Sequence, residues 1–151
     1  MMFNGRFKHA LDAKGRLAIP ARFKEVLAQR GEDCLVLTNR SECLLAFTLA
    51  DWQAIEQKFA KMSFLDQHVI KVMRYFISGA QECPLKQGRI TIPPDLREIA
   101  ELKKDVVLVG GLKTFEIWDR GKWDVEFRDS QASFLDDSQK LHETYNFLVG
   151  E

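Results

Sequence analysis

The sequence contains one pattern twice, and this repeat constrains the fold more than any other feature. The stretch DAKGRLAIPARF covers residues 12–23, and LKQGRITIPPDL covers residues 85–96. Both stretches contain a Gly-Arg pair that is followed by strand-forming residues and a proline. The two arginines, Arg16 and Arg89, are 73 positions apart, and the prolines align at the same offset. Because similar segments take similar local structure, the chain is expected to fold as two equivalent halves.

Each half predicts the same order of elements. Alternating apolar and polar residues indicate a half-buried strand before the Gly-Arg pair, and a short strand follows the pair. A proline then favours the start of a helix, two apolar runs indicate two further strands, and a second helix follows. The expected elements of the first half are residues 5–11, 16–19, 20–30, 34–38, 43–47 and 48–62. Those of the second half are residues 79–85, 89–93, 94–102, 106–110 and 115–118, with a helix from residue 119.

Two further helical segments are expected outside the repeated pattern. The stretch LDQHVIKVMRYFISG, residues 65–79, predicts a linking helix between the halves. The acidic stretch after residue 130 predicts a C-terminal helix with few tertiary contacts. Three tryptophans, Trp52, Trp118 and Trp123, occupy apolar repeat positions and are expected in the core or at a subunit interface.

The overall charge indicates no polyanionic partner, because 22 basic residues balance 22 acidic ones. The distribution of charge is uneven, however. Residues 1–30 carry seven basic and two acidic side chains, whereas residues 114–151 carry four basic and nine acidic ones. This asymmetry is typical either of a basic working surface with an acidic tail or of two solvated faces that happen to differ.

Catalytic, cofactor and metal sites are not expected. The three cysteines, Cys34, Cys43 and Cys83, lack metal-ligand spacing and predict reduced, buried thiols in a cytoplasmic protein. The histidines are far apart in sequence, and no phosphate-binding loop or nucleophile motif occurs. No apolar run approaches the ~18 residues that span a bilayer, and the N-terminus lacks a signal-peptide pattern. We therefore expect neither a small-molecule substrate nor a membrane partner.

The Gly-Arg turn is compatible with two roles. Asp12 and Arg16 flank a short turn in which Gly15 can take a positive φ. A carboxylate in this place accepts from turn amides and holds the guanidinium in one rotamer, and an arginine so held can bind phosphate or guanine O6 and N7. The flanking strands are expected to form a hairpin, and a two-stranded ribbon fits the major groove. Taken by itself, one such turn favours a salt-bridged hairpin that only fixes strand register.

The residues MFNGRFKHALDAKGRLAIPARF near the N-terminus and VVLVGGLKTFEIWDRGKW in the second half resemble the MraZ family, and the similarity covers nearly the whole chain. The resemblance implies an α+β fold with two tandem SpoVT-AbrB-like units of the swapped-hairpin β-barrel type. A pseudo-two-fold axis relates the units, and linking and C-terminal helices accompany them. The expected boundaries are residues 5–52 for the first unit, 53–78 for the linking helices, 79–123 for the second unit and 124–151 for the acidic C-terminal helical segment.

The resemblance also implies a function, which is that of a bacterial transcriptional regulator of the division and cell-wall gene cluster. Such a protein is cytoplasmic and nucleoid-associated, and it binds double-stranded DNA at short direct repeats upstream of its own operon. Family members form closed rings of identical subunits, so a homo-oligomeric ring is expected to present its basic hairpins to the repeated DNA elements. The alternative interpretation is a ring-forming protein–protein interaction module without DNA sequence specificity.

The family marks each half with an Asp-x-x-x-Arg motif, and this resemblance favours a DNA contact for the Gly-Arg turns. The first copy is intact from Asp12 to Arg16, whereas Leu85 replaces the aspartate of the second copy. Arg89 is therefore expected to lack an acidic partner and to contribute less than Arg16. The predicted DNA-binding residues are Arg16, Lys14, Asp12, Arg6, Lys8, Arg89 and Lys86.

Overall fold

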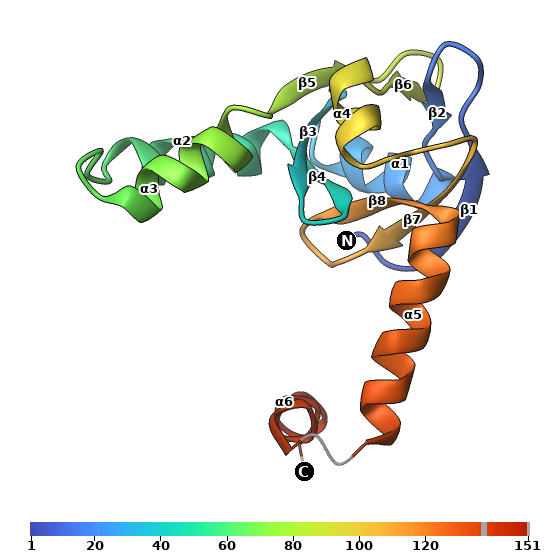
Figure 1. Cartoon of the computed structure of the whole chain (residues 1–151). Helices are drawn as coiled ribbons and strands as arrows, with labels where there is room; N and C mark the ends of the chain where they lie inside the picture. Colours follow the sequence, from blue (N-terminus) through green and yellow to red (C-terminus); the bar gives the residue numbers. More distant parts are fainter. Residues whose placement is uncertain (137–138, 151) are drawn as a thin grey trace. The chain divides into compact units, whose positions relative to one another are not determined.

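The computed structural model describes residues 1–136 and 139–150, and its contacts divide the chain into two units, Met1–Arg120 and Gly121–Glu151. The strands of both repeats lie in the first unit, and the second unit is helical (Figure 1). Three residues of the predicted C-terminal segment, Asp137, Ser138 and Glu151, lie outside the described residues.

Eight strands of the first unit form two antiparallel sheets (Figure 1). The first repeat supplies β1 (Arg6–Ala10), β2 (Arg16–Ala18), β3 (Cys34–Arg40) and β4 (Cys43–Thr48). The second repeat supplies β5 (Gln81–Pro84), β6 (Arg89–Thr91), β7 (Asp105–Gly110) and β8 (Phe115–Asp119). The larger sheet has the order β1-β7-β8-β4-β3-β5, and the smaller sheet pairs β2 with β6.

Some helix ends coincide with capping or stop residues of the sequence. The side-chain oxygen of Thr48 accepts from the backbone N–H of Asp51 at 3.2 Å and caps the helix that follows β4. The first helix ends before Gly31, which takes the positive φ of +66° that suits a helix stop. The helices are α1 (Ala21–Gln29), α2 (Leu49–Ala60), α3 (Gln67–Val72), α4 (Pro94–Ile99), α5 (Arg120–Leu135) and α6 (Gln139–Val149). The predicted linking helix is divided, because α3 continues into a π-helical turn, η1 (Met73–Ile77).

The strand pairing follows a pseudo-two-fold axis. The order of the larger sheet reads the same from both edges when each strand is exchanged for its equivalent in the other repeat. In the smaller sheet, Leu17 pairs with the equivalent residue Ile90, so the axis passes between β2 and β6. Leu45 and Glu116 form the corresponding central pair of β4 and β8. These pairings confirm the predicted α+β fold with two related repeats and additional helices. The residue boundaries expected for the repeats stay predictions.

The hairpin predicted around the first Gly-Arg turn is wrong in its pairing, and around the second turn the antiparallel pairing is limited to the bridge between Lys86 and Arg89. β1 and β2 lie in different sheets, where β1 pairs with β7 and β2 pairs with β6. The turn between them is closed by the Asp12 N–H, which donates to the Arg16 carbonyl at 3.1 Å, but no ladder continues from it. The ring Nδ1 of His9 lies 2.7 Å from the carbonyl oxygen of Ala18 and joins the two strands. Each short strand therefore forms its ladder with its equivalent from the other repeat.

One hydrophobic core joins both repeats. Phe23 of α1 is fully buried, and the centroid of its ring lies 5.2 Å from that of Phe3 and 4.7 Å from that of Phe115 of β8. A second cluster contains Trp52, which is 3% exposed and packs 5.4 Å from the ring of Phe76 in η1. The core position predicted for the tryptophans is confirmed for Trp52 and Trp118, and Trp123 is half-buried.

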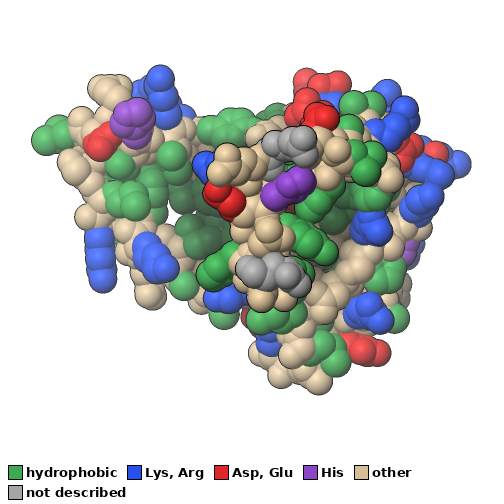
Figure 2. Space-filling view, turned by 90° about the horizontal axis from the view of Figure 1, so that it is seen from below, with side chains coloured by type: hydrophobic (Ala, Val, Ile, Leu, Met, Phe, Trp, Pro, Cys, Tyr) green, Lys and Arg blue, Asp and Glu red, His purple; other side chains and the backbone are tan. Residues whose placement is uncertain are grey.

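Large hydrophobic side chains also lie exposed among the charged ones (Figure 2). In the first unit they include Phe64 at 54% and Leu65 at 91% exposure. In the second unit they include Phe147 at 84% and Leu148 at 74% exposure. Isolated exposed apolar residues are ordinary in proteins, but several together mark a surface that can take up a partner.

Replacing Phe23 with alanine is expected to lower the free energy of unfolding by about 3–5 kcal/mol, because it removes a fully buried ring from the core that the repeats share. Chemical denaturation followed by circular dichroism measures this change. The matched control is Phe64→Ala, which removes an exposed ring and should change the free energy by only about 0.5 kcal/mol. Similar losses in both variants would contradict the position of Phe23 in the core.

Candidate functional site

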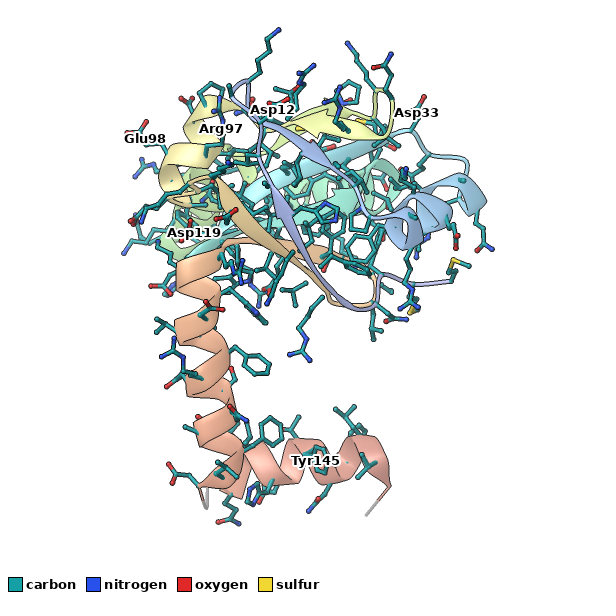
Figure 3. All side chains as sticks on the ribbon, turned by 90° about the vertical axis from the view of Figure 1, so that its right-hand side faces the viewer. Asp12, Asp33, Arg97, Glu98, Asp119 and Tyr145 are labelled. Carbon is teal, nitrogen blue, oxygen red and sulfur yellow. The ribbon has the colours of Figure 1, made fainter. Side chains whose placement is uncertain are left out.

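The first Gly-Arg turn is built around the carboxylate of Asp12, which lies near Arg97 at one end of the first unit (Figure 3). One carboxylate oxygen of Asp12, Oδ1, accepts from the backbone N–H groups of Lys14 and Arg16, each at 2.9 Å. Gly15 has a φ of +78°, which residues with a side chain rarely adopt. The aspartate and the glycine together therefore fix the backbone that carries Arg16.

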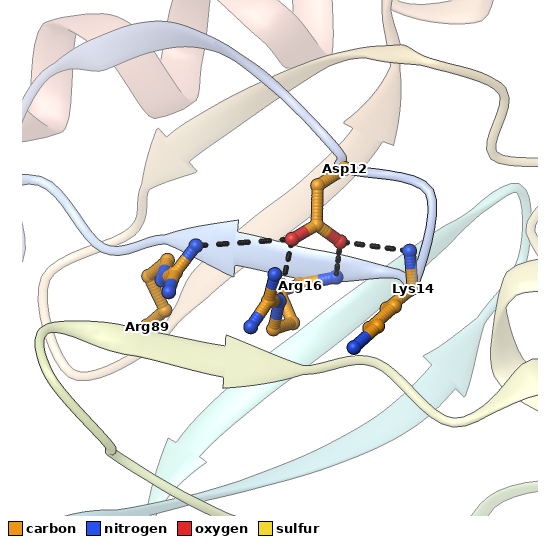
Figure 4. Close-up of polar contacts among 4 residues, drawn as sticks. All are labelled: Asp12, Lys14, Arg16 and Arg89. Atoms are coloured by element: carbon orange, nitrogen blue, oxygen red, sulfur yellow. Dashed lines mark hydrogen bonds and ion pairs between the residues drawn. The ribbon is translucent and has the colours of Figure 1, made fainter.

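The second oxygen of Asp12 contacts both repeated arginines (Figure 4). Asp12 Oδ2 lies 2.5 Å from Nε of Arg16 and 3.8 Å from Nη1 of Arg89. The expectation that Arg89 lacks an acidic partner is therefore wrong. Because β2 pairs with β6, Arg89 of the second repeat lies beside the aspartate of the first, although Leu85 occupies the position equivalent to Asp12 in its own repeat.

The hydrogen bonds of this turn lower the pKa of Asp12. The pKa of the carboxyl falls from its ordinary value of 3.8 to about 2. The largest cause is the backbone N–H of Arg16, and the guanidinium of Arg16 and the N–H of Lys14 act in the same direction against partial desolvation. At neutral pH the carboxylate is ionised and holds the guanidinium of Arg16 by a charge-assisted hydrogen bond.

The second Gly-Arg turn replaces the aspartate with backbone bonds. The backbone N–H of Lys86 donates to the carbonyl oxygen of Arg89 at 2.8 Å, and the N–H of Arg89 donates to the carbonyl oxygen of Lys86 at 3.0 Å. Between them, Gln87 and Gly88 have φ values of +52° and +75°, as the central residues of a type I′ turn require. A tight two-residue turn thus holds Arg89 without a carboxylate of its own.

Both arginines lie on the outward face of the β2–β6 pair. Leu17 and Ile90 at its centre are buried, so their neighbours in each strand point the other way. The side chains of Arg16 and Arg89 are 39% and 38% exposed. Each arginine is opposite a small residue of the partner strand, Thr91 or Ala18, which leaves both guanidinium groups accessible from one side.

The other predicted site residues lie around this face at different places. Lys14 and Lys86 are exposed in the two turns, one beside each arginine. Arg6 and Lys8 lie on the exposed face of β1, whereas His9, on its other face, contacts β2. The structure thus brings Asp12, Arg16 and Arg89 together directly, and the DNA contacts of the whole set stay predictions.

Two basic residues near the turns were not predicted from the sequence. Arg97 of α4 lies over Gly15, and Lys24 of α1 lies over Gly88. They are 73 positions apart, so the repeat offset that relates Arg16 to Arg89 also relates these two residues, but their position over the turns depends on the pairing of β2 with β6. Arg97 also borders an open hollow of about 720 Å³ in which Lys103 and Lys104 balance Glu98 and Glu101.

The cysteines do not form a reactive site. Cys43 and Cys83 are buried as predicted, whereas Cys34 is half-buried; burial raises the pKa of the Cys34 thiol and raises that of Cys83 to about 12. Within residues 1–136 and 139–150, no group of three or more His, Cys, Asp or Glu side chains could hold a metal ion. None of the helices in the described ranges has the length and apolar character that a membrane crossing needs.

The fold and site define a two-repeat protein that presents paired arginines on one outward face. Residues 2–72 and 76–144 match the profile of the family described as "MraZ protein, putative antitoxin-like". The protein named transcriptional regulator MraZ from Syntrophobacter fumaroxidans is 47% identical over 149 residues, which are 98% of this chain and 95% of that relative. Its namesake from Acetivibrio thermocellus is 39% identical over 141 residues, which are 93% of this chain and 96% of the relative. The chain therefore belongs to the MraZ family, a family of transcriptional regulators and not of enzymes.

Asp12→Asn is expected to destabilise the protein at neutral pH but much less near pH 2. Because folding holds the pKa of Asp12 at about 2 instead of 3.8, the stabilisation by this carboxylate is present above pH 3.8 and is lost as the pH falls through about 2. Urea unfolding midpoints of the wild type and the variant, measured at a series of pH values, check this convergence. A difference that persists unchanged at pH 2 would contradict the role of the charged carboxylate.

Proposed function

We propose that the chain is a sequence-specific DNA-binding regulator that uses the two Gly-Arg turns to contact double-stranded DNA. The observation that carries the proposal is the pair of arginines on one outward face, both beside the carboxylate of Asp12. The family resemblance extends the proposal to the target, which is the set of short direct repeats upstream of its own operon in the division and cell-wall gene cluster. The protein would then act in the cytoplasm as part of the nucleoid.

The chemistry of arginine supports a role in recognition. A guanidinium can donate two parallel hydrogen bonds to a phosphate or to the O6 and N7 atoms of guanine in the major groove. Arg16 is already oriented by Asp12, so it loses less side-chain freedom on binding than an unrestrained arginine would. Lys14 and Lys86 in the turns are suited to contact phosphates, which add affinity without sequence discrimination.

The small size of the ribbon supports binding by several subunits at once. The β2–β6 pair contains only three residues from each repeat, so one subunit covers little DNA surface. Subunits of a closed ring would bind linked DNA repeats with a high effective concentration. This arrangement explains how a chain of zero net charge can bind a polyanion, because the basic surface is local and is repeated around the ring.

The exposed hydrophobic side chains favour assembly into an oligomer. An oligomer of this kind is also compatible with a second function. A ring-forming protein–protein interaction module would use the same apolar surfaces and direct its basic face to an acidic protein. The two functions differ in their dependence on DNA sequence. Binding to the duplex upstream of the protein's own gene and to a scrambled duplex of equal composition, titrated at several salt concentrations, separates them.

Arg16→Ala is expected to weaken binding to the upstream duplex by about 1–3 kcal/mol per engaged subunit and to reduce discrimination against the scrambled duplex. Arg89→Ala is expected to have a smaller effect, since Arg89 lies 3.8 Å from Asp12 whereas Arg16 makes a hydrogen bond of 2.5 Å. Fluorescence anisotropy titrations measure both. The matched control is Arg74→Ala, which removes an exposed arginine of η1 and should leave both affinities unchanged.

A larger loss in Arg89→Ala than in Arg16→Ala would show that orientation by Asp12 does not determine recognition. Unchanged affinity together with unchanged discrimination in both variants would remove the two arginines from the DNA-binding surface. Each variant must retain the oligomeric state of the wild type for the comparison to hold.

The protein is expected to form a closed oligomer in solution. Exposed side chains such as Leu65 and Phe147 need cover from water, and a repeated head-to-tail contact between identical chains closes into a ring when its rotation permits. Multi-angle light scattering over micromolar concentrations measures the mass. A monomer throughout that range would contradict the ring, while DNA binding by the monomer would remain open to test.

A further inference from the structure

A basic side chain from the other repeat lies over each of the two Gly-Arg turns. The two side chains differ in how closely they approach their turn. A methyl group added at Gly15 would lie 2.6 Å from Cζ and 2.8 Å from Nε of Arg97. A methyl group added at Gly88 would lie 3.2 Å from Nζ of Lys24, and the other atoms of that lysine are farther away. Arg97 is therefore packed onto its turn, whereas Lys24 only approaches its turn with a flexible end.

Arg97 is also held in place by a hydrogen bond. Its Nε–H donates to the carbonyl oxygen of Ile92 at 3.0 Å. The N–H of the same residue, Ile92, donates to the carbonyl oxygen of Gly15 at 2.9 Å. A continuous chain of contacts thus runs from the guanidinium of Arg97 through Ile92 to Gly15, which directly precedes Arg16.

The charges around Arg97 disfavour a direct contact with phosphate. The hollow beside it is lined by two lysines, Lys103 and Lys104, but also by the carboxylates of Asp12, Glu98 and Glu101. Asp12 is the partner of Arg16 and Arg89, so the charges that remain beside Arg97 are those of Lys103 and Lys104 against Glu98 and Glu101, and these four cancel. The packing and hydrogen bonding of Arg97, and not its charge, distinguish it from Lys24.

We propose that Arg97 is a positioning residue of the DNA-binding surface, which holds the Gly15 turn in the conformation that presents Arg16. The second repeat thereby determines the geometry of the recognition residue of the first. Lys24, its counterpart, does not brace the Gly88 turn, because only the flexible end of its side chain comes close to Gly88, with Nζ 3.2 Å from an added methyl group. The expected effect on DNA discrimination rests on the proposed DNA-binding function. The contact by which Arg97 holds the Gly15 turn can be tested without DNA.

The first experiment compares Arg97→Ala, Arg97→Lys and the matched control Lys24→Ala on the full chain. The expected result for Arg97→Ala is a loss of about fivefold or more in the ratio of affinities for the upstream and scrambled duplexes. Arg97→Lys should not restore this ratio, because a lysine keeps the charge but lacks the planar Nε–H group. Lys24→Ala should leave the ratio within about twofold of the wild type.

The salt dependence of binding separates positioning from a phosphate contact. Arg97→Ala should leave the slope of log affinity against log salt unchanged. A slope that falls by about one per engaged subunit, with discrimination retained, would make Arg97 a phosphate contact and overturn the proposal. Retained discrimination in Arg97→Ala with an unchanged slope would overturn it as well.

A pair of double-mutant cycles tests the packing directly. The two glycines have nearly the same φ, +78° and +75°, so Gly15→Ala and Gly88→Ala impose similar backbone strain. Their contacts differ, and only the methyl group at position 15 displaces an anchored side chain. Gly15→Ala should therefore have a smaller effect on discrimination in the Arg97→Ala background than in the wild type. The effects of Gly88→Ala and Lys24→Ala on discrimination should add in the double variant. If the effects of Gly15→Ala and Arg97→Ala also add, the proposal is overturned.

Hydrogen exchange of the free protein provides a measurement that does not depend on DNA. In Arg97→Ala, peptides that contain residues 13–17 and 90–93 should exchange faster than in the wild type, whereas Lys24→Ala should not change them. Unchanged exchange in Arg97→Ala and Arg97→Lys would overturn the bracing contact. If the wild type fails to distinguish the two duplexes, the proposed function fails, but this measurement still decides whether Arg97 braces the turn.

Discussion

Antiparallel pairing between equivalent strands determines the architecture of this chain. β2 pairs with β6 around Leu17 and Ile90, and β4 pairs with β8 around Leu45 and Glu116. Neither repeat completes its own sheets, because the edge strands β1 and β5 also pair with strands of the opposite repeat. The apolar faces of both repeats consequently pack into one core. A single chain thus reproduces the symmetry of a dimer, while each half remains able to change its sequence independently.

The same pairing places the residues of the site. Arg16 and Arg89 lie far apart in the sequence, but the β2–β6 ladder brings them onto one face and lets Asp12 contact both. The two repeats also contact each other at the turns, where Arg97 of the second repeat lies over Gly15 and Lys24 of the first lies over Gly88. The Gly15 turn is therefore shaped by its own backbone and by α4 of the other repeat, whereas the Gly88 turn depends mainly on its own backbone bonds.

Local signals made much of this structure predictable. The alternation of β1, the cap at Thr48 and the stop at Gly31 depend on nearby residues, and all three are present in the structure. The internal repeat predicted two related halves for the same reason. The pairing of β2 with β6 could not be read locally, since a turn between two short strands favours a hairpin unless a distant strand competes. The contact of Arg89 with Asp12 and the position of Arg97 follow from that pairing, so they were missed with it.

The leucine at the position equivalent to Asp12, Leu85, is consistent with this shared geometry. Leu85 packs against the common core, so the change adds apolar contact where a carboxylate would need polar partners. The turn beside it no longer needs an aspartate, because Lys86 and Arg89 close it with backbone bonds. One carboxylate beside two guanidinium groups also leaves one positive charge in excess on this face, whereas two aspartates would neutralise it. For a surface that binds a polyanion, one aspartate shared between two arginines orients the side chains and keeps the face basic.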